Sequence, residues 1–256
     1  MIEKERHVLI MDQLRDNGFV SVKDLMAQLD TSRSSIMRDL IALEKQGLLK
    51  REHGGAALPA ITQTLSRKSE PAVAEKINEN VREKRMAAAA AAKRIRPGSC
   101  IFVDSGTTTP YLLEAIQDPD LTVVTASVYL LAHLPKNFPA KVYLLGGLYD
   151  AKYEMNQGEY AGEMLEMFHI DAGFFSASGV DLNSGDVMVA DFSLAASKKR
   201  AMKRCARRYL VIDETKIGQI AESRYAGISD FDEIFVSGKK RKNYPDSFVS
   251  VEERKK

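Results

Sequence analysis

The chain has 256 residues, of which 45% are hydrophobic and 28% charged, and its formal net charge is +2. This composition is typical of a globular protein and excludes a collagenous or intrinsically disordered chain. A chain of this length can form two domains, each with its own hydrophobic core. The N-terminal residues are charged, and no apolar run approaches the roughly 18 residues of a membrane span. We therefore expect a cytoplasmic protein without a membrane partner.

The first 57 residues predict three short helices followed by a small β-ribbon. Apolar residues recur at helical spacing over 3–17 and over 22–29, where Ser21 is placed as an N-cap. A third helix is predicted over Ser32–Gly47, and two short strands then flank the tip His53-Gly54-Gly55. This order of elements predicts a winged helix-turn-helix.

The third predicted helix carries candidate DNA-contacting residues. In a helix-turn-helix the second helix of the pair enters the major groove, and its N-terminal side chains meet the base edges. The predicted contacts with double-stranded operator DNA lie on this helix and on the wing: Ser32, Arg33, Ser34, Ser35, Met37, Arg38, Lys50, Arg51 and His53. The alternative is a packing or dimerisation module, because its amphipathic helices would show the same apolar pattern. Acidic and basic residues are equal in number over residues 1–56, which weakens an argument for DNA binding from charge alone.

The segment SRSSIMRDLIALEKQGLLKREHGGA resembles the N-terminal signature of the DeoR family of bacterial transcriptional regulators. The resemblance extends from Arg6 to Ala57 without a gap. The family typically shows Ser-x-x-Thr-Ile-Arg-Arg-Asp-Leu here, and this chain differs at Ser35 and Met37. The resemblance implies sequence-specific DNA binding by the third helix, with an operator preference that the two differences alter.

Residues 58–96 are predicted to connect two domains. Their first part, up to residue 69, contains Pro59 and little apolar pattern, which favours a linker. Residues 75–95 favour a connecting helix, because the run 87–92 consists of alanine, the strongest helix former, and Pro97-Gly98 follows.

A second domain is predicted over 97–238, where short apolar runs alternate with helical stretches. The predicted strands are 100–104, 121–125, 141–145, 172–176, 209–212 and 233–236, and the predicted helices are 111–116, 160–168 and 193–207. This alternation is typical of a mostly parallel sheet covered on both faces. The chain is thus predicted as α+β, a winged helix-turn-helix followed by an α/β domain. A basic tail, 239–256, is assigned no function.

The loops that follow the predicted strands contain the candidate ligand-binding residues. Ligands of open α/β sheets bind at the carboxyl ends of the strands, and a hydroxyl-rich loop entering a helix suits a phosphate. The first such loop, Asp104-Ser105-Gly106-Thr107-Thr108, has this composition, although its hydroxyls also suit helix capping. Later loops add Thr125, Ser127, Gly146, Gly147 and Lys216.

The segments VDSGTT, VVTAS, LLGG, SASGVD, SKKRAM and IDETKIG resemble the C-terminal effector domain of the DeoR family. That domain is related in fold to ribose-phosphate isomerases. The resemblance implies a phosphorylated sugar or sugar derivative as effector, with Asp104–Thr108, Lys199 and Lys216 in its pocket.

Two functions account for these features. The first is a transcriptional regulator, a repressor of a carbohydrate-catabolism operon, whose DNA binding a phosphorylated sugar controls. We expect a homo-oligomer, since paired half-sites require paired recognition helices. The alternative is a sugar-phosphate isomerase with an appended helical module. No catalytic residue is assigned, because Ala195 stands where the family commonly has an acidic residue.

The sequence predicts neither a metal site nor a cofactor. His7, His53, His133 and His169 are scattered without ligand spacing. The two cysteines lie in apolar patterns and are predicted to be reduced, buried thiols.

Overall fold

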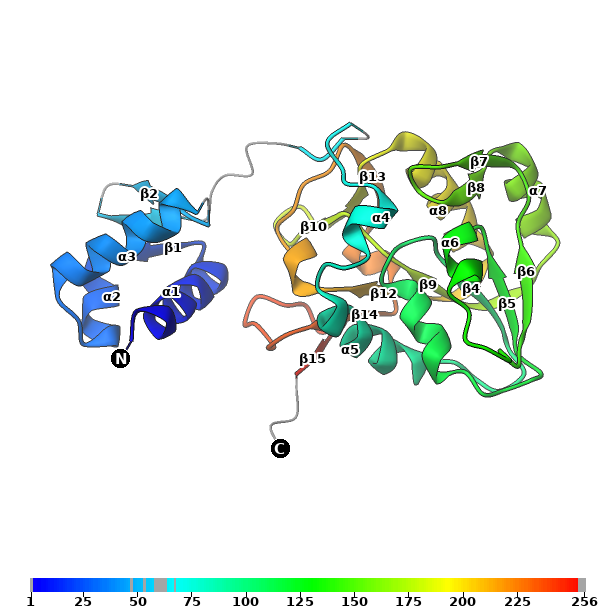
Figure 1. The fold of residues 1–256 in the computed structure, drawn as a ribbon, viewed down its shortest axis with the longest axis horizontal. Coiled ribbons are helices and arrows are strands. Elements are labelled where there is room, and N and C mark those ends of the chain that lie inside the picture. The colour runs from blue at the N-terminus through cyan, green and yellow to red at the C-terminus, as the bar shows by residue number, and fades with distance from the viewer. Residues whose placement is uncertain (1, 47, 53, 58–63, 67, 253–256) are drawn as a thin grey trace. The chain divides into compact units, whose positions relative to one another are not determined.

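In a computed structural model the chain divides into two compact units (Figure 1). The structure describes residues 2–46, 48–52, 54–57, 64–66 and 68–252. The first unit comprises Met1–Gln63 and Arg241–Asn243, and the second comprises Thr64–Lys240 and Tyr244–Lys256. Gly47 and His53, the predicted helix end and wing tip, lie outside the described residues.

The first unit contains the three predicted helices and a three-stranded antiparallel sheet of order β1-β3-β2. The helices are α1 (Glu3–Asn17), α2 (Val22–Leu29) and α3 (Arg33–Lys45), and the strands are β1 (Phe19–Ser21), β2 (Lys50–Glu52) and β3 (Gly55–Ala57). The winged helix-turn-helix is therefore confirmed. The strand β1 was not predicted; it lies beside β3 and joins the wing to the turn between α1 and α2.

Local side-chain chemistry explains where these helices begin. The Ser21 hydroxyl accepts a hydrogen bond from the Asp24 amide at 3.0 Å, and the Ser32 hydroxyl accepts one from the Ser35 amide at 3.3 Å. Both hydroxyls satisfy an amide that has no partner within its own helix. The apolar faces of the helices then meet in one core, in which Ile10 and Ile36 have no exposed surface.

The second unit is built on a seven-stranded sheet in which every neighbouring pair is parallel. In spatial order the strands are β15 (Phe248–Val251), β14 (Glu233–Ser237), β12 (Cys205–Ile212), β9 (Ile170–Phe175), β4 (Cys100–Val103), β5 (Thr122–Thr125) and β6 (Lys141–Leu144). All six predicted strands are present. The seventh, β15, lies in the segment predicted as a tail.

Two hydrophobic cores cover the two faces of this sheet. On one face lie α5 (Val81–Ala92), the 3₁₀-helix η1 (Thr109–Ala115) and α6 (Val128–Ala132). On the other lie α7 (Glu159–Glu166) and α8 (Phe192–Arg204). Because successive strand residues point to opposite faces, Ile101 and Val103 join the first core and Phe102 the second.

Three predicted boundaries in this unit are wrong. The helix predicted over 193–207 ends at Arg204, and β12 begins at the next residue. The helix predicted over 75–95 is two helices, α4 (Val73–Lys76) and α5, separated by Asn80 in a left-handed conformation with φ of 49°. The helix predicted over 111–116 is the 3₁₀-helix η1.

Shorter elements complete the second unit. They are the antiparallel pair β7 (Leu148–Asp150) and β8 (Met155–Gln157), the antiparallel strands β10 (Gly179–Asp181), β11 (Asp186–Val189) and β13 (Ser223–Gly227), and the 3₁₀-helices η2 (Glu214–Lys216) and η3 (Ile228–Asp230).

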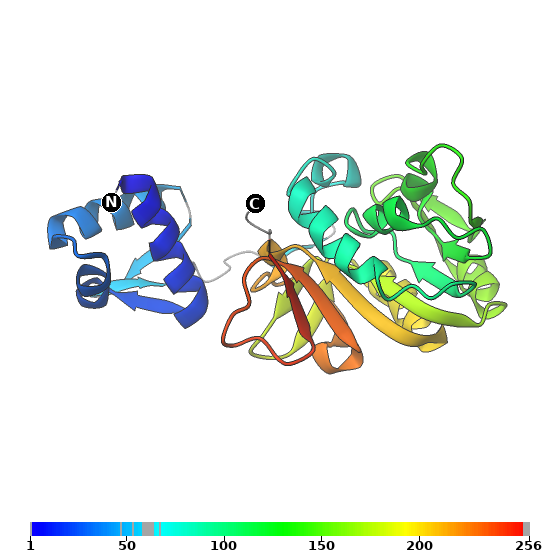
Figure 2. The ribbon, with the colours of Figure 1, turned by 90° about the horizontal axis from the view of Figure 1, so that it is seen from below.

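The segment predicted to connect the domains is part of the second unit from residue 64 onward. The alanine face of α5 lies along β12 and β14, where Ala87, Ala88 and Ala91 are fully buried (Figures 1 and 2). Small side chains allow this close approach. The second half of the predicted linker also contacts this unit, since Leu65 pairs with Ala221; residues 58–63 lie outside the described part.

The two cysteines are free thiols, as predicted. Cys205 is buried, and burial raises the pKa of its thiol to about 12. Cys100 is half-buried rather than buried. Within the described residues, no helix is long and apolar enough to cross a membrane.

We expect Ile36→Ala to destabilise the first unit by about 2–5 kcal/mol, because it removes a fully buried side chain from the core between the helices. Calorimetric unfolding of the full chain measures this change. Val8→Ala is the matched control on α1, where the side chain is 60% exposed, and should change the stability by less than about 0.5 kcal/mol. Equal losses of stability in the two variants would contradict the assignment of Ile36 to the core.

Candidate effector pocket and DNA-reading helix

A buried carboxylate holds α1 against α3. Asp39 on α3 is only 3% exposed, and its two oxygens accept hydrogen bonds from the Arg6 guanidinium at 2.7 and 3.0 Å. The His7 imidazole lies 3.2 Å from the same carboxylate. A two-point Arg–carboxylate contact fixes orientation as well as distance. The pair therefore sets the angle at which α3 leaves the core of the first unit.

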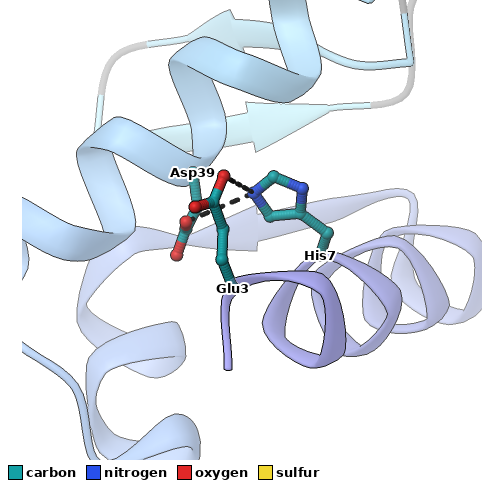
Figure 3. Close-up of side chains that lie close together, drawn as sticks. All are labelled: Glu3, His7 and Asp39. Carbon is teal, nitrogen blue, oxygen red and sulfur yellow. Dashed lines mark hydrogen bonds and ion pairs between the residues drawn. The ribbon is translucent and has the colours of Figure 1, made fainter. Parts of the chain in front are cut away.

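Glu3, His7 and Asp39 bring potential metal-ligating atoms within 4.8 Å of one another (Figure 3). Both carboxylates approach the same ring nitrogen of His7, Glu3 at 3.8 Å and Asp39 at 3.2 Å. The sequence pattern did not reveal this cluster. Both Asp39 oxygens already accept from Arg6, whose positive charge opposes a metal cation at the same carboxylate. The cluster is best explained as an ion-pair network between the helices.

The opposite side of α3 presents most of the residues predicted to contact DNA. Ser32, Arg33, Ser34 and Arg38 are exposed, and Ser35 is half-exposed. The Arg38 guanidinium donates to the Ser34 carbonyl and to the Ser35 hydroxyl, both at 3.4 Å, and these long contacts leave it free to be redirected to a base. Met37, in contrast, packs against the core of the unit.

Among the described residues of the wing, one basic side chain is placed to contact a phosphate without first breaking an ion pair. Lys50 is exposed and has no resolved ion-pair partner there. Arg51 pairs with Glu44 of α3 at 2.6 Å, and its amide donates to the same carboxylate at 2.9 Å. Arg51 therefore fixes the wing to α3, and a phosphate would have to compete with Glu44 for its charge.

At the carboxyl ends of β4 and β9, a cavity of about 60 Å³ opens beside the loop Ser105–Thr108. We call it the strand-end cavity. Lysines and hydroxyls from separate elements line it: Ser105, Gly106, Thr107, Thr108, Ser176, Ser178, Lys198 and Lys216, with Glu70, Val73 and Lys76 from the segment that precedes α5.

The loop Ser105–Thr108 is held in a tight turn against β9. The Thr109 hydroxyl donates to the Asp104 carbonyl at 2.7 Å and contacts the Gly106 carbonyl at 3.1 Å. A Cβ atom on Gly106 would lie 2.1 Å from the Ser176 hydroxyl oxygen, so only glycine fits this close approach. The loop is therefore positioned by contacts that leave its hydroxyl residues lining the cavity.

Lys198, which lines this cavity, forms a buried ion pair with Asp104. Both side chains are almost inaccessible, at 6% and 4% exposure. Asp104 also accepts from the Ser176 amide at 3.0 Å and from the Ser176 hydroxyl at 2.6 Å. The Lys198 ammonium lies 5.4 Å from the centre of the Tyr225 ring. Burial, together with the Asp104 charge, raises the pKa of Tyr225 well above its usual range.

A fourth lysine, Lys84 on α5, contacts the backbone of Lys76, which lines the cavity. It is 2% exposed, and its ammonium donates to the Lys76 carbonyl at 2.5 Å. Burial lowers the pKa of Lys84 to about 8, against an opposing effect of Asp213. Burial also lowers the pKa of Lys76, while Glu70 raises it and Lys216 and Lys198 lower it further. Several positive charges thus converge on one small polar cavity.

A larger cavity of about 260 Å³ lies next to the first, between α7 and α8. We call it the α7–α8 cavity. Ser105, Leu194 and Lys198 line both cavities. Asn156, Gln157, Ser193 and Ser197 give the larger one polar groups among its apolar walls. A ligand bound at the loop has room to extend into this space.

Comparison with known proteins identifies both units. Residues 6–62 match the DeoR-like helix-turn-helix domain, and residues 79–238 match the DeoR C terminal sensor domain. The chain belongs to the DeoR family. It is therefore a DNA-binding transcriptional regulator, and the second unit is its sensor domain.

Two relatives match almost the full length of this DeoR-family regulator. An uncharacterized HTH-type transcriptional regulator FruR of Bacillus subtilis is 33% identical over 231 residues, covering 90% of this chain and 89% of the relative. The lactose phosphotransferase system repressor of Streptococcus mutans is 33% identical over 221 residues, covering 86% of each. A solved D-ribose-5-phosphate isomerase in complex with phospho-erythronic acid covers 54% of each chain with 19% identity and a TM-score of 0.39, a likeness too distant to decide function.

The sensor domain places the predicted pocket residues in different environments. Ser105–Thr108 and Lys216 line the strand-end cavity, with Asp104 beside them in the α7–α8 cavity wall. Lys199 is exposed and lines neither cavity, whereas its neighbour Lys198 lines both. The structure therefore replaces Lys199 with Lys198 as the lysine that α8 directs into the pocket.

Four other predicted pocket residues line neither cavity. Thr125 donates to the Val103 carbonyl at 2.7 Å, and Ser127 caps α6 by accepting from the Leu130 amide at 3.0 Å. Gly147 approaches the Gln157 carbonyl so closely that a Cβ atom would lie 2.4 Å from it. Gly146 precedes it in the same turn. These residues shape the strand ends rather than the cavity surface.

Sequence reasoning missed four polar residues of the pocket region: Glu70, Lys76, Lys84 and Ser176. A signal existed for the choice of Lys198 over Lys199. Lys198 is four residues after Leu194 and four before Met202, both buried, and this spacing places it on the inner face of α8. Glu70 and Lys76 carry no such signal, because their positions depend on how the preceding segment folds across the sheet.

We expect Lys198→Met to destabilise the sensor domain by about 3–5 kcal/mol, because it leaves the buried Asp104 carboxylate without its cation. Urea unfolding followed by circular dichroism measures this loss. Lys199→Met, at the exposed neighbouring position, should change the stability by less than about 0.5 kcal/mol. Equal losses would show that the ion pair does not stabilise the domain.

We expect Arg38→Ala to weaken binding to the specific operator by about 1–3 kcal/mol, because Arg38 is the base-reading candidate on α3. Lys50→Ala should weaken binding to operator and random DNA alike, since a phosphate contact carries no sequence information. Fluorescence anisotropy at fixed salt measures both affinities. An Arg38→Ala variant with equal losses on the two DNAs would contradict the base-reading role.

Proposed function

We propose that this regulator is a repressor of a carbohydrate-catabolism operon and that a phosphorylated sugar or sugar derivative controls its binding to operator DNA. The observation that carries the proposal is the strand-end cavity. There the loop Ser105–Thr108 meets the ammonium groups of Lys76, Lys198 and Lys216.

The chemistry of this cavity suits a phosphate monoester. Hydroxyl donors and lysine ammonium groups form charge-assisted hydrogen bonds with phosphate oxygens, and these are about twice as strong as neutral ones. Lys198 is paired with Asp104 and Lys76 with Glu70, which leaves Lys216 as the cavity lysine best placed to compensate the charge of a phosphate. The adjoining α7–α8 cavity supplies space and polar side chains for the sugar.

The relatives support the repressor assignment. The protein of Streptococcus mutans is named a lactose phosphotransferase system repressor, and it matches both domains of this chain over most of their length. We further propose a homo-oligomer, because two-fold symmetric operators are bound by paired recognition helices.

We propose that the sensor domain binds its sugar phosphate without turnover. Isomerisation requires a general base free to take a proton from the sugar. Asp104 is held by Lys198 and Ser176, and Ala195 offers a methyl group only. The isomerase alternative is less well supported for this reason. Incubation with a panel of aldose and ketose phosphates tests it, and detectable interconversion would overturn the non-enzymatic assignment.

We expect Lys216→Ala to bind operator DNA as the wild type does but to stay bound when sugar phosphates are added, since it removes a cavity lysine while leaving the first unit intact. Fluorescence anisotropy of a labelled promoter fragment, titrated with a panel of phosphorylated sugars, measures the response. Lys203→Ala, an exposed position on α8, is the control and should respond normally. A normal response of Lys216→Ala would refute the pocket, and no response of the wild type to any sugar phosphate would refute the effector class.

A further inference from the structure

Residues 64–76, described except for residue 67, lie across the strand-end cavity and are called the strap. The Leu65 amide donates to the Ile220 carbonyl at 2.9 Å, and the Leu65 carbonyl accepts from the Glu222 amide at 2.8 Å. Further along, the buried Val73 donates its amide to the Lys152 carbonyl at 3.2 Å. The strap is thus attached to the sensor domain at both ends, and in sequence it directly follows the last residues of the DNA-binding unit.

Between these attachments the strap places a carboxylate inside the cavity. Glu70 is 5% exposed, and its Oε1 accepts from the Ser178 hydroxyl at 2.6 Å and from the Lys76 ammonium at 3.0 Å. Its Oε2 is buried, with no hydrogen-bond partner among the described residues. A buried carboxylate oxygen without a donor is costly. Glu70 is therefore held in the cavity by two contacts while one of its oxygens remains unsatisfied.

Glu70 lines the same cavity as the loop Ser105–Thr108 and Lys216. A phosphate bound to that loop would bring up to two negative charges into a space of about 60 Å³ that already holds a carboxylate. The two anions would repel each other and would compete for Lys76. Simultaneous occupation of the cavity by the phosphate and the Glu70 carboxylate is therefore unfavourable.

We propose that Glu70 is an internal competitor of the effector: a phosphorylated ligand binds at the loop Ser105–Thr108 by displacing the Glu70 carboxylate, pairs with Lys76 in its place, and thereby releases the middle of the strap that follows the DNA-binding unit in sequence. Displacement breaks the Glu70 contacts with Ser178 and Lys76. Lys84 binds the Lys76 carbonyl at one end of the strap, and the backbone hydrogen bonds of Leu65 hold the other end, so the freed part is the segment between these attachments. The ligand class, a phosphate monoester, rests on the proposed function.

The first test measures inorganic phosphate binding by isothermal titration calorimetry, with chloride keeping the ionic strength constant. Glu70→Gln keeps the shape of the side chain and removes the competing charge, so it should bind phosphate at least about tenfold more tightly than the wild type. Glu75→Gln removes a charge from the exposed side of α4 and should bind as the wild type does. If Glu70→Gln gained no more affinity for phosphate than Glu75→Gln, the competition between Glu70 and phosphate would be refuted.

The second test measures strap release by limited trypsin digestion. Lys68 is exposed on the strap, and cleavage after it is compared with cleavage after Lys136, an exposed lysine elsewhere in the sensor domain. Phosphate should accelerate cleavage after Lys68 relative to Lys136 in the wild type, and Glu70→Gln should be cleaved rapidly without phosphate. An unchanged ratio in both cases would overturn strap release.

The two proposals fail in distinguishable ways. If no sugar phosphate dissociates the operator complex, the proposed function fails, but the phosphate titration still reports directly on the competition with Glu70. If sugar phosphates dissociate the complex and Glu70→Gln binds phosphate no more tightly, the proposed function stands and the role of Glu70 is refuted.

Discussion

The sensor domain depends on one buried ion pair, between Asp104 at the end of β4 and Lys198 on α8. The carboxylate also binds the amide and hydroxyl of Ser176, which follows β9. Three elements distant in sequence therefore meet at a single charge. Ions buried at low dielectric are stable only when all their partners are in place, so the network tolerates little displacement of any of them. Because Asp104 is held in place by these contacts, the loop Ser105–Thr108 that follows it starts from a fixed position.

The DNA-binding unit uses a related arrangement for a different purpose. Asp39 on α3 is buried against Arg6 on α1, just as Asp104 is buried against a lysine on a distant helix. In the first unit the pair points inward, and this leaves the opposite side of α3, with Ser34 and Arg38, directed away from the core. Each unit thus uses charge burial to orient the surface on which its ligand is expected to bind.

Much of this architecture could be predicted from local patterns, and the exceptions have physical causes. Helix starts at Ser21 and Ser32 follow from capping chemistry, and six of the seven strands of the large sheet follow from continuous apolar runs. The break at Asn80 had a local signal, because asparagine adopts the left-handed conformation more readily than most residues, but the alanine run that follows favoured one continuous helix. Lys198 was predictable in principle, from its spacing to buried residues on α8. Glu70 and Lys76 were not, since contacts across more than a hundred residues, such as that of Glu70 with Ser178, place them.

The position of β15 bears on where the sensor domain ends. The family match stops at residue 238, yet Phe248–Val251 forms the outermost parallel strand and pairs with β14 along its length. A fragment cut at residue 238 would leave the backbone donors and acceptors of β14 without partners on that side. Such an exposed strand edge, rich in Ile234, Phe235 and Val236, is a template for association with other chains. Solubility of an isolated sensor fragment is thus governed by a short segment that lies beyond the recognisable domain.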